Sequence, residues 1–188
     1  DIFHNKNKIE NYELKIFNIF ISILKNIAPV IIIPGNHDYL QQFPDEPGLL
    51  DSSIYDLDNI YFLNKTKNII INNIGITTIA INDTLKEGES FGIKDILPSF
   101  PINFNKNIEH IIGIFHGSFG KTFYNENKEV EEDNNSYPLD MLNNLDIAIL
   151  GDIHLRQSSK HNKCHYAYSG SLLQQNYGET IIDHGYIL

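Results

Sequence analysis

The chain has 188 residues, 41% of them hydrophobic, and a formal net charge of −10 at neutral pH. This hydrophobic content supports a real core and excludes an intrinsically disordered chain. The acidic balance argues against a general polyanion-binding surface, because affinity for nucleic acid normally rests on Lys and Arg. It does not exclude a metal-centred site for phosphates, since bound cations can dominate the local charge.

The sequence carries little sign of a membrane or of secretion. No apolar run approaches the roughly 18 residues that span a bilayer, so we expect no membrane partner. The single cysteine, Cys164, excludes an internal disulfide and favours a reducing, intracellular location. The first residue is Asp1 rather than Met, so we expect a fragment or a processed product.

The first elements are a helix and a strand. Apolar residues at helical spacing predict a helix over residues 8–28, which Pro29 stops. We expect the apolar side of this helix to belong to the core. A continuous apolar run then predicts a buried strand over 30–33, and the turn Gly35–Asp38 follows it.

The remaining elements suggest an α/β protein. A short helix is expected over 138–144, and a solvated acidic loop over 125–136. Further loops are expected over 39–53 and 83–107. Strands are expected at 60–63, 68–71, 74–81, 111–115, 166–169 and 186–188, and a buried strand is expected at 147–150. This alternation of helices and strands indicates α/β layering. Neither a repeat nor a linker is visible, so we expect one domain over residues 1–188.

The turn after the first strand carries the most informative side chains. Gly35 permits a tight turn and a close approach by a ligand. Asn36 offers a neutral oxygen ligand, and His37 offers an imidazole that can bind a metal or carry a proton. Asp38 can hold His37 or its loop in place. Ligands bind at the carboxyl ends of strands in open α/β sheets, so we expect a site here.

The same chemistry recurs at other strand ends. His116 follows one predicted strand, and Asp152 and His154 follow another. Asp1 and His4 precede the first helix, where a strand lost upstream would end. Carboxylates and imidazoles together with an amide oxygen suit Mn, Fe, Zn or a similar divalent metal. These residues therefore predict a metal site.

These motifs resemble the signature of the calcineurin-like metallophosphoesterase superfamily. That signature runs Asp-X-His, Gly-Asp, Gly-Asn-His-Asp/Glu, a lone His and Gly-His-X-His. Asp1–His4 resembles the end of the second motif in an Asp-X-Phe-His form, and Gly35–Asp38 resembles the third. His116 resembles the fourth, and Gly151–His154 the fifth.

Two segments resemble one branch of the superfamily, the nuclease subunit of the double-strand-break-repair complex (the SbcD type, with its phage and giant-virus relatives). They are the Asp-X-Phe-His form of the second motif and the segment Tyr168–Glu179 followed by His184–Tyr186. The resemblance runs from Asp1 to Leu188. It implies a layered β-sandwich flanked by helices, truncated at its N-terminus.

The chain departs from the family pattern in two places. The first motif, Asp-X-His, is absent because the sequence begins after it. We therefore expect one metal to lack two ligands, and the isolated chain to be inactive or nearly so. Asp152 stands where the family usually has His. Asp is also a competent ligand for a hard divalent metal, so we expect binding to persist with more negative charge.

The resemblance implies two divalent metal ions, with Mn²⁺ preferred and Mg²⁺, Fe or Zn²⁺ as alternatives. Asp1 would bridge the two ions. Asn36, His116 and Asp152 would complete one metal, and His154 would belong to the other. The ions would activate a hydroxide and clamp the phosphodiester for in-line attack.

The resemblance also implies two catalytic histidines. His37 would protonate or electrostatically stabilise the leaving oxygen. His4 would steady the phosphate or the reacting nucleotide.

The leading hypothesis is a DNA exo- or endonuclease of recombination and double-strand-break repair. Its implied partners are DNA, an ATPase subunit of the SMC type and a second copy of the chain. Its location would be the cytoplasm, the nucleus or a viral replication site. Two alternatives stay open: a phosphoesterase of the same fold acting on phosphoproteins or small phosphodiesters, and a scaffold without catalysis.

Other motifs have plainer interpretations. Gly170-Ser171 and Gly178-Glu179 are interpreted as structural turns. Gly117–Thr122 lacks the spacing of a nucleotide-binding loop, because only two residues separate its glycines. A further metal site at His161, Cys164 and His165 is disfavoured against a surface hairpin.

Overall fold

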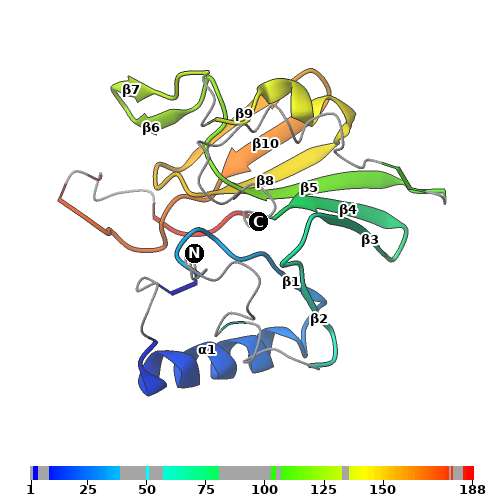
Figure 1. The fold of residues 1–188 in the computed structure, drawn as a ribbon, viewed down its shortest axis with the longest axis vertical. Coiled ribbons are helices and arrows are strands. Elements are labelled where there is room, and N and C mark those ends of the chain that lie inside the picture. Colours follow the sequence, from blue (N-terminus) through cyan, green and yellow to red (C-terminus); the bar gives the residue numbers. More distant parts are fainter. Residues whose placement is uncertain are drawn as a thin grey trace, which may run out of the picture.

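The computed structural model describes residues 2–3, 9–38, 50, 57–80, 103–104, 107–132, 136–177, 179 and 184–188. The described strands form a six-stranded sheet and two two-stranded sheets. The helix α1 (Asn11–Leu24) lies on the side of the molecule that holds the small sheet β1–β2 (Figure 1). The α/β fold class is confirmed.

The helix α1 starts at a capping box. The Glu13 carboxylate accepts the Glu10 backbone N–H at 2.9 Å, which satisfies a donor that the helix itself leaves unpaired. The helix ends at Leu24 rather than at residue 28, because residues 25–28 turn with shorter-range backbone bonds such as Ile27 N–H to Leu24 O.

The helix buries a narrow stripe. Phe17 and Ile21 are buried against the strands, but Ile16, Phe20 and Ile23 are each about half exposed. The expectation that the apolar side belongs to the core is therefore wrong for these three. Within the described residues, the strands beneath α1 form a sheet of only two strands, which covers little of the helix.

The small sheet pairs β1 (Val30–Ile32) with β2 (Ile60–Phe62) in parallel. Ile32 packs with Phe3 and Phe17 in a core cluster of its own. The rings of Phe3 and Phe17 meet edge-on at 5.5 Å. This cluster joins the start of the described chain to the helix and to the strand that leads into the Gly35–Asp38 turn.

The large sheet has the strand order β3-β4-β5-β8-β10-β9. Four central strands are parallel: β4 (Ile74–Ile79), β5 (His110–His116), β8 (Ile147–Gly151) and β10 (Cys164–Tyr168). The edges β3 (Lys67–Ile71) and β9 (Gln157–His161) are antiparallel to their neighbours. Asn72 and Asn73 turn between β3 and β4 at φ angles of 49° and 64°, as a tight hairpin requires.

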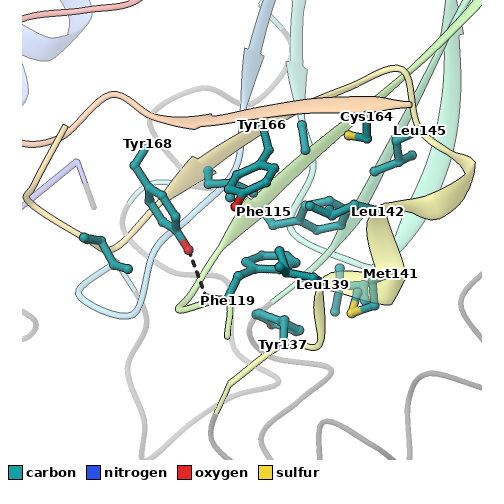
Figure 2. Packing of buried hydrophobic residues seen from close by; sticks show 14 of the residues in the cluster. Phe115, Phe119, Tyr137, Leu139, Met141, Leu142, Leu145, Cys164, Tyr166 and Tyr168 are labelled. Atoms are coloured by element: carbon teal, nitrogen blue, oxygen red, sulfur yellow. Dashed lines mark hydrogen bonds between the residues drawn. The ribbon is translucent and has the colours of Figure 1, made fainter. Parts of the chain in front are cut away.

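The larger core cluster covers one face of this sheet. Phe115 from β5 and Tyr168 from β10 point into it, and Leu139, Met141 and Leu142 join them from the 3₁₀ helix η2 (Leu139–Asn144) (Figure 2). Leu150 of β8 belongs to the same cluster. Phe119 is fully buried there and lies 5.1 Å from the ring of Tyr137. The packing fixes the connection that leaves β5 directly after His116.

Tyr168 ties this connection to the sheet with its hydroxyl group. The hydroxyl donates to the carbonyl of Gly117 at 2.8 Å. It also accepts the N–H of Phe119 at 3.0 Å (Figure 2). Burial raises the pKa of Tyr168, so the hydroxyl keeps its proton. The Tyr168 side chain therefore provides a hydrogen-bond partner for two backbone groups beyond the end of β5, the Gly117 carbonyl and the Phe119 N–H.

Four expectations differ from the structure. The edge strand β9 was not predicted, because its polar residues lack an apolar alternation. The acidic loop holds a short hairpin, β6 (Phe123–Asn125) with β7 (Lys128–Glu129). Residues 186–188 form no strand. The strand at 147–150 is buried on one face only, since Ile147 and Ile149 are nearly half exposed.

The loops expected over 39–53 and 83–107 lie almost wholly outside the described residues. Over the described part of the chain, no helix is both long enough and apolar enough to cross a membrane.

The substitution Tyr168→Phe tests the tie between the sheet and the connection after His116. It leaves the Phe119 N–H and the Gly117 carbonyl without this partner. We expect it to lower the free energy of unfolding by about 1–3 kcal/mol, measured by urea denaturation. Tyr166→Phe on the same strand is the matched control, expected within about 0.5 kcal/mol of the unchanged protein. Equal effects of the two substitutions would contradict this role.

Candidate metal centre

The candidate centre lies where three strands end. Asn36 follows β1, His116 is the last residue of β5, and Asp152 comes directly after β8. The parallel register of β5 and β8 sets His116 opposite Gly151. Because the carboxyl ends of neighbouring parallel strands lie side by side, His116 and Asp152 meet at the ends of β5 and β8. The turn after β1, which belongs to the separate small sheet, brings Asn36 to His116.

Three side-chain atoms that could bind a metal ion lie close together at the ends of these strands. The Nε2 atom of His116 lies 3.3 Å from Oδ1 of Asn36 and 3.7 Å from Oδ1 of Asp152. Two ligands that share one ion about 2.1 Å away lie about 3.0–3.4 Å apart. The separation between His116 and Asn36 fits this range, and the separation between His116 and Asp152 is slightly wider. A cation bound by these three atoms would replace the proton on Nε2 of His116.

Two glycines make room for this arrangement. A Cβ atom at Gly151 would lie 3.0 Å from Nδ1 of His116. A Cβ atom at Gly117 would lie 2.5 Å from the ring of Tyr137, and the φ angle of +147° also favours glycine. Side chains at either position would displace the His116 ring or the backbone next to it.

The Asp152 carboxylate has a second contact besides the one with His116. Its Oδ2 atom accepts the Ser118 hydroxyl at 2.9 Å, while Oδ1 faces His116. Its backbone has a φ angle of +92°, which is strained for a residue with a side chain. Ser118 was not singled out by sequence reasoning; its only signal is its position two residues after His116.

Burial is the main cause of a pKa of about 3 for His116, and neighbouring positive charges, among them His37 and His154, act in the same direction. The ring is therefore neutral at pH 7, which is the form that binds a metal.

Asp38 anchors the beginning of the described chain to the Gly35 turn. Its carboxylate accepts the backbone N–H of Ile2 at 3.0 Å on both oxygens, and that of Phe3 at 3.0 Å. It also accepts the N–H of Gly35 at 2.8 Å. The expectation that Asp38 holds its loop is confirmed.

Two predicted site residues, Asp1 and His4, lie outside the described residues. Within the described ranges, no group of three or more His, Cys, Asp or Glu side chains is arranged to hold a metal ion. The cluster at His116 contains two residues of these types, and the amide of Asn36 supplies its third donor.

His154 has a close partner that sequence reasoning interpreted as a turn residue. Its Nδ1 atom lies 2.6 Å from Oε1 of Glu179. Burial raises the pKa of Glu179, but hydrogen bonds from the Gln175 N–H and from His154 outweigh it, so the pKa lies below its ordinary value. The only sequence signal for Glu179 was its place in the Tyr168–Glu179 segment.

The disfavoured second cluster does not converge. Cys164 is fully buried in the core, and burial raises the pKa of its thiol to about 11. His161 instead lies 3.3 Å from the exposed carboxylate of Asp140. The pairing of β9 with β10 confirms a hairpin in this segment. The expectation of a surface hairpin is wrong for β10, which is an inner strand of the sheet with Cys164 buried.

A comparison with protein families decides the broad assignment. Residues 1–156 match the profile described as "Calcineurin-like phosphoesterase". The chain belongs to this family. The match covers the turn after β1, the end of β5 and the residues after β8, and it ends before β9.

Two individual proteins are similar to the chain. A protein of Acanthamoeba polyphaga mimivirus, described as "Uncharacterized protein R555", is 31% identical over 192 residues. The alignment includes 98% of this chain, and the chain spans 13% of the length of that protein. A solved crystal structure matches 85% of this chain and 64% of its own, at 12% identity and a TM-score of 0.48.

Membership of the calcineurin-like phosphoesterase family implies hydrolysis of phosphoesters with divalent metal ions. The chemistry of the donor set fits such an ion, because an amide oxygen and a carboxylate both lie close to a neutral buried imidazole. Ser118 fixes the carboxylate, as a hydrogen-bonded support of a metal ligand does.

Asp38→Ala tests the anchoring of the segment that precedes the helix. Loss of the carboxylate removes the partner of three backbone N–H groups at a cost of about 1–3 kcal/mol. We expect the amides of Phe3 and Gly35 to exchange their protons about 5- to 150-fold faster, measured by hydrogen exchange. Asp58→Ala, at an exposed turn, is the control. Unchanged exchange at Phe3 and Gly35 in Asp38→Ala would show that the contact contributes nothing.

Proposed function

We propose that the chain is the hydrolytic part of a metal-dependent DNA nuclease that acts in recombination and double-strand-break repair. The observation that carries this proposal is that Asn36 and Asp152 both lie close to His116 at the carboxyl ends of β5 and β8. Divalent cations bound there would lower the pKa of a water nucleophile and neutralise the charge of a phosphodiester.

The residues divide the work of this site. Asn36, His116 and Asp152 would hold one cation, and Asp1 and His154 would help to hold a second. His37, which follows Asn36 in the same turn, would protonate or stabilise the leaving oxygen. His4 would steady the phosphate. Mn²⁺ is the preferred ion.

The choice of DNA rests on the likeness to the SbcD-type branch. Asp1–His4 and Tyr168–Glu179 carry that likeness, and the similarity to a giant-virus protein agrees with it. The net charge of −10 means that cations rather than a basic surface attract the DNA backbone. The site of action is intracellular, where one buried cysteine stays reduced.

The proposed partners are an SMC-type ATPase and a second copy of the chain. The half-exposed apolar residues Ile16, Phe20 and Ile23 on α1 support the second copy. An apolar helix face of this kind is usually covered by protein.

A second candidate is a phosphoesterase that acts on phosphoproteins or small phosphodiesters. The same acidic charge favours it, because a small substrate needs no long basic surface.

The test is a degradation assay on the intact protein. Linear double-stranded DNA and a generic aryl phosphate are incubated with Mn²⁺, with Mg²⁺ or with a chelator. We expect cleavage of DNA that depends on Mn²⁺ and falls by about 100-fold or more in His37→Ala, because a positioned general acid contributes about that much. His110→Ala is the matched control, since His110 lies at the opposite end of β5 from His116.

Each other outcome has a definite meaning. Intact DNA with hydrolysed aryl phosphate would replace the nuclease with the small-substrate enzyme. No turnover of either substrate would favour a scaffold. Cleavage that His37→Ala leaves unchanged would remove His37 from the mechanism.

A further inference from the structure

The loop after β10 contacts His154, which lies two residues after Asp152 in the sequence. The Nδ1 atom of His154 and the Oε1 atom of Glu179 are 2.6 Å apart, although 25 residues separate them in sequence. The Glu179 side chain is 12% exposed, whereas the His154 side chain is 45% exposed. Glu179 is thus the shielded member of the pair, and the ring of His154 stays open to an ion from solvent.

The Glu179 carboxylate is fully supplied with hydrogen-bond donors. Its Oε1 atom faces the Asn176 side-chain amide at 2.7 Å as well as His154. Its Oε2 atom accepts the Gln175 backbone N–H at 2.8 Å and the Ser171 hydroxyl at 3.2 Å. Four donors fix the carboxylate in one orientation, so it presents a fixed acceptor to the histidine.

The acceptor character of Glu179 decides where His154 carries its proton. An ionised carboxylate only accepts hydrogen bonds, so the ring must donate from Nδ1. A neutral imidazole has a single N–H, and the proton on Nδ1 leaves Nε2 with a free lone pair. Nε2 lies on the far side of the ring from Glu179. That lone pair is the ligand that a divalent cation needs.

The same loop holds the backbone of His154. The Ser171 N–H donates to the His154 carbonyl at 3.2 Å. A Cβ atom at Gly170 would lie 2.7 Å from that carbonyl oxygen, and Gly170 has a φ angle of +73°. Only glycine permits this approach. The histidine is therefore held at its backbone by Gly170 and Ser171, and at its ring by Glu179.

A further contact closes the loop. The Nδ1 atom of His184 lies 3.0 Å from the Ser171 carbonyl and 3.1 Å from the Ser171 hydroxyl. Because a carbonyl only accepts, His184 donates to it, and the Ser171 hydroxyl is left to donate to Glu179. His184, near the end of the chain, thus orients Ser171, whose hydroxyl donates a hydrogen bond to the Glu179 carboxylate.

We propose that Glu179 is a positioning residue for His154: it fixes the ring in the tautomer that carries its proton on Nδ1 and so presents Nε2 to a divalent cation. This inference rests on the proposed metal centre and assigns a task to the loop after β10, which lies beyond the part of the chain that matches the family profile.

The proposal is tested by nuclear magnetic resonance of the protein labelled with ¹⁵N at histidine, without metal. The ¹⁵N shifts of the two ring nitrogens show which one carries the proton. We expect His154 to be protonated at Nδ1 in the unchanged protein. In Glu179→Ala we expect a mixture of tautomers, because the acceptor is gone. Glu179→Gln keeps an acceptor oxygen and is expected to retain the Nδ1–H tautomer.

A titration with Zn²⁺, which is diamagnetic, then follows the Nε2 resonance of His154. Loss of a supporting partner typically weakens a metal site by about 10- to 100-fold, so the midpoint in Glu179→Ala should rise by that factor. Glu109→Ala is the matched control, because Glu109 is exposed and precedes β5 at the end remote from His116. We expect it to change neither reading.

Two results would overturn the inference. One is a His154 ring that is protonated at Nε2, or that exchanges between tautomers, in the unchanged protein; this reading does not depend on how well any variant folds. The other is an unchanged tautomer and an unchanged Zn²⁺ midpoint in Glu179→Ala. Failure of the proposed metal centre looks different: Zn²⁺ would move the resonances of neither His154 nor His116, while the tautomers would still be measured.

Discussion

The parallel pairing of β5 with β8 is the constraint on which the site depends. Its register sets Phe115 opposite Leu150 in the core and, one position further, His116 opposite Gly151 at the edge of the sheet. A slip of one residue would turn every side chain of the strand to the other face, which would expose Phe115 and remove His116 from the centre. Because Phe115 and Leu150 are buried in the larger core cluster, the packing of that cluster also fixes the position of the His116 ring.

Much of this site could be predicted from local sequence signals. Asn36, His116 and Asp152 each follow an apolar run that predicts a strand, and strand ends gather ligands in α/β proteins. The structure brings these three residues together. Their role as metal ligands stays a prediction. The role of Asp38 was also visible, since a carboxylate at the end of a tight turn commonly holds backbone N–H groups.

The supporting residues could not be predicted, because their partners are distant in sequence. Ser118 contacts Asp152 across 34 residues, and Glu179 contacts His154 across 25. Neither residue has a spacing or a periodicity that marks it. The strand β9 could not be predicted for a related reason. Its residues, such as Ser158 and Lys160, are polar, and they form a strand because they pair with β10 rather than because they are buried. Sequence patterns thus reveal the candidate metal ligands but not the hydrogen bonds that orient them.

The central claim is that Asn36, His116 and Asp152 hold one divalent cation. Anomalous X-ray diffraction from crystals of the protein grown with Mn²⁺ tests it most directly. The account predicts an anomalous peak about 2.0–2.6 Å from Oδ1 of Asn36, Nε2 of His116 and the Asp152 carboxylate. A peak only at a surface pair such as His161 and Asp140, or no peak at all, would contradict it.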